Sequence, residues 1–136
     1  MGAWAETAFS DDVALDWLDD QFELDAVGAV KKALGAAIAT SESDYLEYQE
    51  GIEARAAAEV VAIARGRARD GESDELLAQV STALGEIAAV PSIEVTALAA
   101  LDRVTSDNSE IQALWTEDGP NADWDNANAD LRSRLS

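Results

Sequence analysis

The sequence predicts an all-α fold, a compact bundle of six to seven short amphipathic helices in a single domain. Apolar residues recur three and four positions apart along most of the chain, as in helices with one buried face. Alanine, the strongest helix former, occurs 28 times, mostly in these periodic segments, and its small side chain allows helices to approach closely. Alternation with a period of two does not persist, so no strand is predicted.

Three helices are predicted in the first half of the chain. The first follows Ser10, which we expect to cap it; the second runs from about Asp25 to Thr40; the third runs from about Gln49 to Gly66, a natural left-handed stop. Their predicted inward stripes are Val13, Trp17 and Leu18; Val27, Val30, Leu34 and Ile38; and Ile52, Ala56, Val60 and Ile63. Residues 1–9 lack periodicity, and we expect this irregular segment to pack on the bundle through Trp4 and Phe9.

Four helical pieces are predicted in the second half. They run from a Ser73 cap to Pro91, from Ser92 to a weak break at 106–109, from Ile111 to the Gly119-Pro120 stop, and from Asp123 to Leu135. Their predicted inward residues are Leu77, Val80, Leu84 and Ile87; Val95, Leu98, Leu101 and either Val104 or Thr105; Ile111, Leu114 and Trp115; and Trp124, either Ala127 or Asn128, Leu131 and Leu135. The piece that begins at Ile111 is either a separate helix or a continuation after a kink.

The composition excludes most familiar enzyme chemistry. The 136 residues include no cysteine and no histidine, which rules out disulfides, thiolate nucleophiles, imidazole bases and zinc-finger sites. Two carboxyl groups can still catalyse sugar hydrolysis across a cleft, but a small alanine-rich bundle offers little room for one. We therefore expect no enzyme and no cofactor, and the sequence indicates no specific biochemical activity.

The charge restricts the kinds of partner that the chain can have. Twenty-eight acidic side chains against nine basic ones give a formal charge of −19, a field that repels nucleic-acid phosphates, so direct nucleic-acid binding is not expected. The sequence has no run of 18 apolar residues, so no membrane span is predicted. The acidic start does not resemble a signal peptide. We expect a cytoplasmic protein that is a monomer or a homodimer.

The densest group of carboxylates lies on the first predicted helix. Four of them share one face at spacings of three and four residues and form a candidate acidic interaction face: Asp12, Asp16, Asp19 and Asp20. A solvated face is the expected reading, because charged helix faces usually meet water. The alternative is a site for a hard cation or a cationic partner, because rows of carboxylates bind ions such as Ca²⁺.

Two groups of basic residues are also candidates for specific contacts. Arg103 lies inside an amphipathic helix one turn before Asp107, and we expect a partly buried structural ion pair at the predicted kink. Arg65, Arg67 and Arg69 form a concentrated positive patch. We expect this patch to pair with acids of neighbouring helices, and anion binding is the alternative.

Several segments together resemble a bacterial family known as domain of unknown function four-two-five-nine. The matching positions are Met1-Gly2-Ala3-Trp4 with Phe9, Asp11, Asp12, Ala14, Asp16 and Trp17; Ala58 to Ala62; and Ala100 to Val104, Asp107 to Glu110, Leu114-Trp115, Trp124 and Leu131-Arg132. The resemblance spans nearly the whole chain and implies a small bacterial protein. The family has no established activity, so the resemblance assigns no role to any residue.

The leading functional hypothesis is a non-catalytic protein-binding module, of the inhibitor or immunity type, whose acidic faces dock a basic protein. The charge of −19 would speed association with a cationic target. One alternative is that the carboxylates mimic the charge of DNA, and another is that acidity adapts the protein to high salt. The third is a carboxylate-bound metal on the Asp-rich face.

Overall fold

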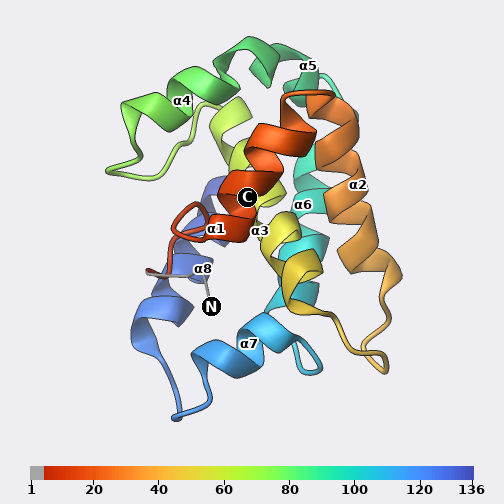
Figure 1. Ribbon diagram of the computed structural model, residues 1–136, viewed down its shortest axis with the longest axis vertical. Helices are drawn as coiled ribbons and strands as arrows, with labels where there is room; N and C mark the ends of the chain where they lie inside the picture. Colours follow the sequence, from red (N-terminus) through yellow and green to blue (C-terminus); the bar gives the residue numbers. More distant parts are fainter. Residues whose placement is uncertain (1–4) are drawn as a thin grey trace.

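The alanine-rich segment after residue 47 forms the central helix α3 (Tyr48–Ala64) of the computed structural model, which describes residues 5–136 (Figure 1). The other elements are α1 (Asp12–Trp17), the π-helical turn η1 (Leu18–Phe22), α2 (Ala26–Ala39), α4 (Asp74–Val80), the 3₁₀ turn η2 (Ser81–Ala83), α5 (Leu84–Ala88), α6 (Ile93–Val104), α7 (Glu110–Trp115) and α8 (Ala122–Leu135). The all-α class is therefore confirmed. In the described part of the chain, the β-type contact is one isolated parallel bridge between Leu46 and Ser109.

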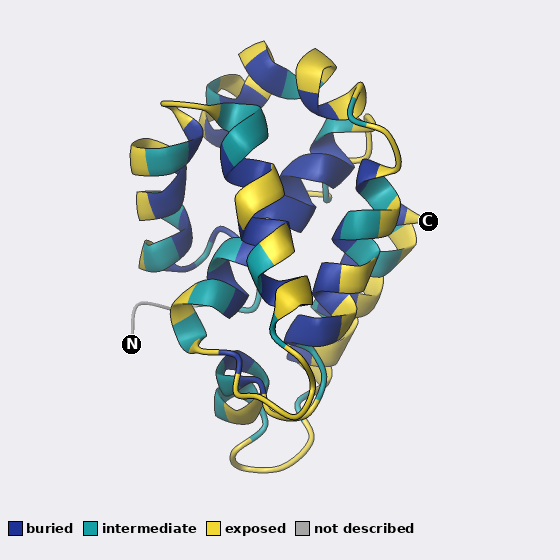
Figure 2. Cartoon of the chain, turned by 90° about the vertical axis from the view of Figure 1, so that its right-hand side faces the viewer, coloured by how far each residue is buried: buried dark blue, intermediate teal, exposed yellow. Residues whose placement is uncertain are grey.

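The core of the protein is α3, which is buried on every side from Ala54 to Ile63 (Figure 2). Helices α1, α2, α5, α6, α7 and α8 all pack against it. The predicted stripe of α3 is buried as expected, but the expectation of a single buried face is wrong, because Ala54, Ala57 and Ala58 on other sides are buried too. Side chains this small let neighbouring helices surround α3 closely.

Most helix ends follow the local signals in the sequence. The Ser73 hydroxyl accepts a hydrogen bond from the Leu76 N–H at 3.1 Å, and Gly66 ends α3 with a φ of 76°. The cap of α1 is corrected by one residue. It is Asp11, not Ser10, whose carboxylate accepts from the Val13 N–H at 2.7 Å.

Several predicted stripes are corrected by the structure, and in α2 the error is Ile38, which is exposed. The helix expected between Ser73 and Pro91 is divided into α4, η2 and α5, and Leu76 and Ala83 are buried where Leu77 and Leu84 were expected. Val95 of α6 is 62% exposed, because it lies outside the buried face with which α6 packs in the core. Its buried residues are Ile93, Ala97, Ala100, Leu101, Arg103 and Val104.

Part of the N-terminal segment packs on the bundle as predicted. Ala8 and Phe9 are buried, whereas the prediction for Trp4 falls outside the residues that the structure describes. Within residues 5–136, no single helix is long and apolar enough to cross a membrane. The segments 74–88 and 93–104 meet the length and composition criteria together, but they are bent by 115° at the break between them.

Candidate functional site

The predicted acidic face is present at the surface, but the fold divides it. Asp12, Asp16, Asp19 and Asp20 are all exposed. Asp16 and Asp20 line one cavity of about 230 Å³, whereas the carboxylate of Asp19 accepts a hydrogen bond at 3.0 Å from Gln79 of α4. The π-helical geometry of η1 changes the spacing per turn, so the four carboxylates do not form one straight row.

The cavity beside Asp16 and Asp20 is polar, and α3 forms its far wall. Its other lining residues are Val13, Trp17, Gln21, Gln49 and Glu53. The carboxylate of Glu53 accepts hydrogen bonds from the amides of Gln49 at 3.1 Å and Gln21 at 3.4 Å. No group of three or more acidic side chains within residues 5–136 is arranged to hold a metal ion.

Asp11, next to the acidic face, is buried and has a structural partner. The phenol of Tyr48 at the start of α3 donates a hydrogen bond to one oxygen of this carboxylate, and the Val13 N–H donates to the other. Burial of the phenol, together with the hydrogen bond and negative charge of Asp11, raises the pKa of Tyr48 well above its usual range. This contact fixes the start of α1 against α3.

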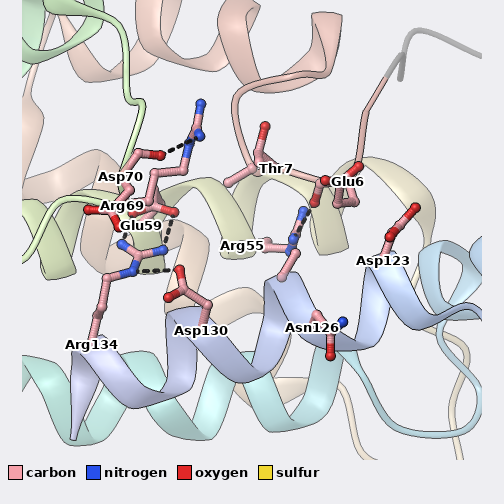
Figure 3. Close-up of a pocket in the computed structure, with 12 residues that line it drawn as sticks. Glu6, Thr7, Arg55, Glu59, Arg69, Asp70, Asp123, Asn126, Asp130 and Arg134 are labelled. Carbon is pink, nitrogen blue, oxygen red and sulfur yellow. Dashed lines mark hydrogen bonds and ion pairs between the residues drawn. The ribbon is translucent and has the colours of Figure 1, made fainter.

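A second cavity, of about 310 Å³, lies between the N-terminal segment, α3 and α8 (Figure 3). Its charged lining comprises Arg55, Arg69 and Arg134 together with Glu6, Glu59, Asp70, Asp123 and Asp130. Both arginine guanidinium groups and carboxylates therefore line it. The sequence did not predict this site, since its members are separated by most of the chain.

Arg55 is the buried cation beside this cavity, with 4% of its surface exposed. Its Nε donates to the side-chain oxygen of Asn128 at 2.8 Å, and its Nη2 donates to the main-chain oxygen of Glu6. The guanidinium carbon also lies 4.5 Å from the ring centroid of Trp124. Burial lowers the pKa of Arg55 to about 10, so the side chain remains charged at neutral pH. Arg55 therefore joins three distant segments of the chain.

The other wall of the cavity is a buried ion pair between α3 and α8. Glu59, 2% exposed, receives hydrogen bonds from two nitrogens of Arg134, one of them at 2.9 Å. The Nε of Arg134 also donates to Asp130 at 2.9 Å. Burial alone would lower the pKa of Arg134, but the hydrogen bonds and charges of Glu59 and Asp130 outweigh burial and raise it. These charged groups pair with one another and hold α8 against α3.

Arg103 is buried as predicted, but its contacts differ from the predicted ion pair. Its guanidinium reaches the main-chain oxygen of Asp107 at 3.3 Å, and no ion pair with the Asp107 carboxylate is formed. The remaining acceptors are the main-chain oxygens of Thr40, Ser41, Asp44 and Asn108 and the hydroxyl of Ser106. The side chain thus ties the loop after α2 to the loop after α6.

The arginine triplet makes internal contacts. Arg65 forms an ion pair with Glu94 at 3.3 Å, and Arg69 forms one with Glu72 at the same distance. Arg67 donates a hydrogen bond to the main-chain oxygen of Ser136 at 2.8 Å. The expected pairing with an acid of a neighbouring helix is therefore found for Arg65 with Glu94 of α6, whereas Arg69 pairs with an acid of its own loop.

A third cavity, of about 270 Å³, is formed by the loop between α7 and α8. Its lining residues are Leu114, Trp115, Glu117, Asp118, Gly119, Pro120 and Asn121, and none of them is basic. Trp115 was predicted to be a core residue, but it is only half-buried, and its ring stacks on that of Trp124 at 5.4 Å between centroids. The sequence feature that could have indicated this cavity is the acidic pair Glu117 and Asp118 shortly after Trp115.

Comparison with known proteins gives one match. A family model described as "Domain of unknown function (DUF4259)" matches residues 2–127 of the 136. No curated protein and no solved structure gives a significant match.

Proposed function

The chain belongs to the DUF4259 family of domains of unknown function, and we propose that it is a non-catalytic binding module whose acidic surface docks a basic protein. The observation that carries this proposal is the separation of charge between the inside and the outside of the fold. Most of the 28 acidic side chains are exposed, but among the nine basic ones only Lys31, Lys32, Arg65 and Arg67 are. The surface is therefore more one-sided in charge than the composition alone indicates.

The charged side chains inside the protein support a binding role over a catalytic one. The guanidinium of Arg103 donates hydrogen bonds to main-chain carbonyl oxygens, and the carboxylate of Glu59 accepts them from Arg134. A catalytic carboxyl group is expected to have a shifted pKa and an opposed partner across a cleft. We propose accordingly that the protein is not an enzyme, and that it acts in the bacterial cytoplasm as an inhibitor or immunity-type partner.

Long-range attraction makes the acidic surface suited to rapid association with a cationic protein. Facing surfaces of opposite charge raise the association rate, and 0.1 M salt largely screens this attraction beyond about 10 Å. The α1–η1 face, defined as Asp12, Asp16, Asp19 and Asp20, is the densest exposed group. Binding through this face should weaken as salt is raised.

A charge-matched pair of variants tests the proposal. The first changes the four aspartates of the α1–η1 face to asparagine, and the second carries Glu42→Gln, Asp44→Asn, Glu75→Gln and Glu86→Gln, which are exposed elsewhere. The probe is a synthetic lysine- and arginine-rich peptide, titrated by calorimetry at low and physiological salt. A larger loss of affinity in the first variant supports the docking face.

The high-salt alternative has a different outcome in the same variants. If acidity serves only salt adaptation, both variants should gain equal thermal stability at low salt through reduced self-repulsion. They should also bind the peptide equally. Equal affinities in the two variants would therefore count against a specific docking face.

A further inference from the structure

The cavity formed by the α7–α8 loop lies at one end of the molecule, where the loop extends away from the helices (Figure 1). Its residues 117–120 are exposed, and Leu114 and Trp115 beside them are half-buried. Tryptophan is enriched among the residues that dominate binding energy at protein interfaces, especially where it lines a pocket. The exposed position of this cavity and its tryptophan are typical of a site that binds another protein.

The cavity is held in shape by contacts within the fold. Trp115 stacks on Trp124 with an angle of 4° between the rings, and the Trp124 indole donates to Gln112 at 2.7 Å. Asn121 acts twice, since its amide donates to the Trp115 carbonyl at 3.2 Å and its oxygen caps α8 by accepting from the Trp124 N–H. A preformed pocket loses little conformational entropy when it binds.

The loop itself is a tight turn. The Gly119 N–H donates to the Thr116 carbonyl at 3.0 Å, and Gly119 has a φ of 109°, a conformation that favours glycine. This turn places Glu117 and Asp118 at the exposed rim. Within residues 5–136, neither carboxylate forms a hydrogen bond or an ion pair.

These features select the chemistry of the occupant. The two carboxylates and the overall charge of −19 repel an anion and favour a cation. An indole attracts a cation electrostatically, and the attraction is strongest when the cation is desolvated. Lysine and arginine match both parts of the pocket, because their apolar stems pack on apolar side chains while their charged ends remain near carboxylates.

We infer that this pocket, which we call the Trp115 pocket, receives a lysine or arginine side chain of a basic protein partner. The stem of that side chain packs on Leu114, Trp115 and Pro120, and its charged end meets Glu117 and Asp118. The inference rests on the proposed docking of a basic protein and names one pocket that binds a side chain of that protein. It requires no change in the fold.

Two peptides test the chemistry of the pocket. The first carries a central arginine between glycine and serine residues, and the second carries citrulline there, which has nearly the same shape without the charge. Calorimetry and tryptophan fluorescence measure binding to the full chain. We expect the arginine peptide to bind about tenfold more tightly, a difference of about 1.4 kcal/mol.

Variants identify the pocket as the place of binding. Glu117→Gln with Asp118→Asn should weaken binding of the arginine peptide about fivefold to tenfold. Glu42→Gln with Asp44→Asn, an equal charge change at exposed positions outside the pocket, should have a much smaller effect. Trp115→Phe keeps an aromatic ring and should retain most of the binding while abolishing the fluorescence change.

The outcomes separate this inference from the proposed function. Equal losses in the two double variants, or equal binding of the two peptides, would overturn the Trp115 pocket. The docking proposal would still stand if the α1–η1 face variant alone lost affinity for the lysine- and arginine-rich peptide. A wild-type chain that binds none of these peptides would overturn both.

Discussion

The guanidinium of Arg55 on the central helix lies over the ring of Trp124 on the last helix, 4.5 Å from its centroid. Trp124 in turn stacks on Trp115, so a line of contacts runs from the core to the α7–α8 loop. The Trp115 pocket is thus linked to the buried cation of Arg55 through the ring of Trp124. The fold and the inferred binding point are physically connected through these three side chains.

Arg55→Lys is expected to lower the free energy of unfolding by about 2–4 kcal/mol. A lysine ammonium does not reproduce the planar donors that reach Asn128 and Glu6 together. Urea denaturation measures the change. Arg132→Lys is the control, because its ion pair with Asp102 is exposed and should be worth less than about 1 kcal/mol. Equal losses in the two variants would contradict a structural role for Arg55.

Arg103→Lys and Asp107→Asn should differ sharply. The lysine variant loses most of the hydrogen bonds to the carbonyls of two loops and should cost about 2–4 kcal/mol. The asparagine variant keeps the main-chain oxygen that Arg103 contacts, so its cost should stay within about 0.5 kcal/mol. A large loss of stability in Asp107→Asn, measured by urea denaturation, would instead support the Arg103–Asp107 ion pair that the sequence predicted.

Tyr48→Phe should cost about 1–3 kcal/mol, because Asp11 stays buried and loses the phenol as a donor. The pKa of Tyr48 is raised in the folded state, so the stability it contributes is complete below the ordinary value of 10.0. That contribution is lost as the pH rises above 10. Melting temperatures between pH 8 and 11 should therefore fall more steeply in wild type than in the variant.

The exposed Tyr45 supplies the control for this pH dependence. Tyr45→Phe should leave the alkaline decline of the melting temperature unchanged. An identical decline in wild type and Tyr48→Phe would show that the buried phenol does not control it.

Two glycines of similar surroundings should respond in opposite directions to alanine. Nothing lies within 4 Å of a Cβ placed at Gly66 or at Gly35. Gly66 has a φ of 76°, so Gly66→Ala should destabilise the protein by about 1 kcal/mol. Gly35 lies inside α2, and Gly35→Ala should stabilise by about 0.5–1 kcal/mol. Thermal melting of both variants measures the difference, and a loss in Gly35→Ala would contradict the reasoning.

The sequence predicted several helix ends that depend on nearby residues. Ser73 caps one helix and Gly66 ends another, because these effects act within a single turn, although the predicted Ser10 cap was wrong by one residue. The exposure of the α1–η1 face also followed from local periodicity. Its division between the η1 cavity and Gln79 did not, because π-helical geometry and the approach of α4 are not encoded in a pattern of charge.

Alanine is the main reason for the errors in buried faces. Valine and isoleucine were expected to face inward, but Val95 and Ile38 are exposed while Ala97 and Ala37 are buried. Where helices pack closely, a small side chain fits between them better than a branched one. Hydrophobicity alone therefore misplaced Ile38 and Val95, whereas Val30, Leu34, Leu101 and Val104 are buried as predicted.

The sequence by itself determined that this protein is helical, strongly acidic and without thiol or imidazole groups, because composition and local periodicity carry that information. Tertiary structure alone decided which charges are internal. Arg55 meets Asn128 across 73 positions, and Glu59 meets Arg134 across 75. Contacts over such separations depend on how the helices pack. Because the packing encloses these cations, most of the charged side chains left at the exposed surface are carboxylates.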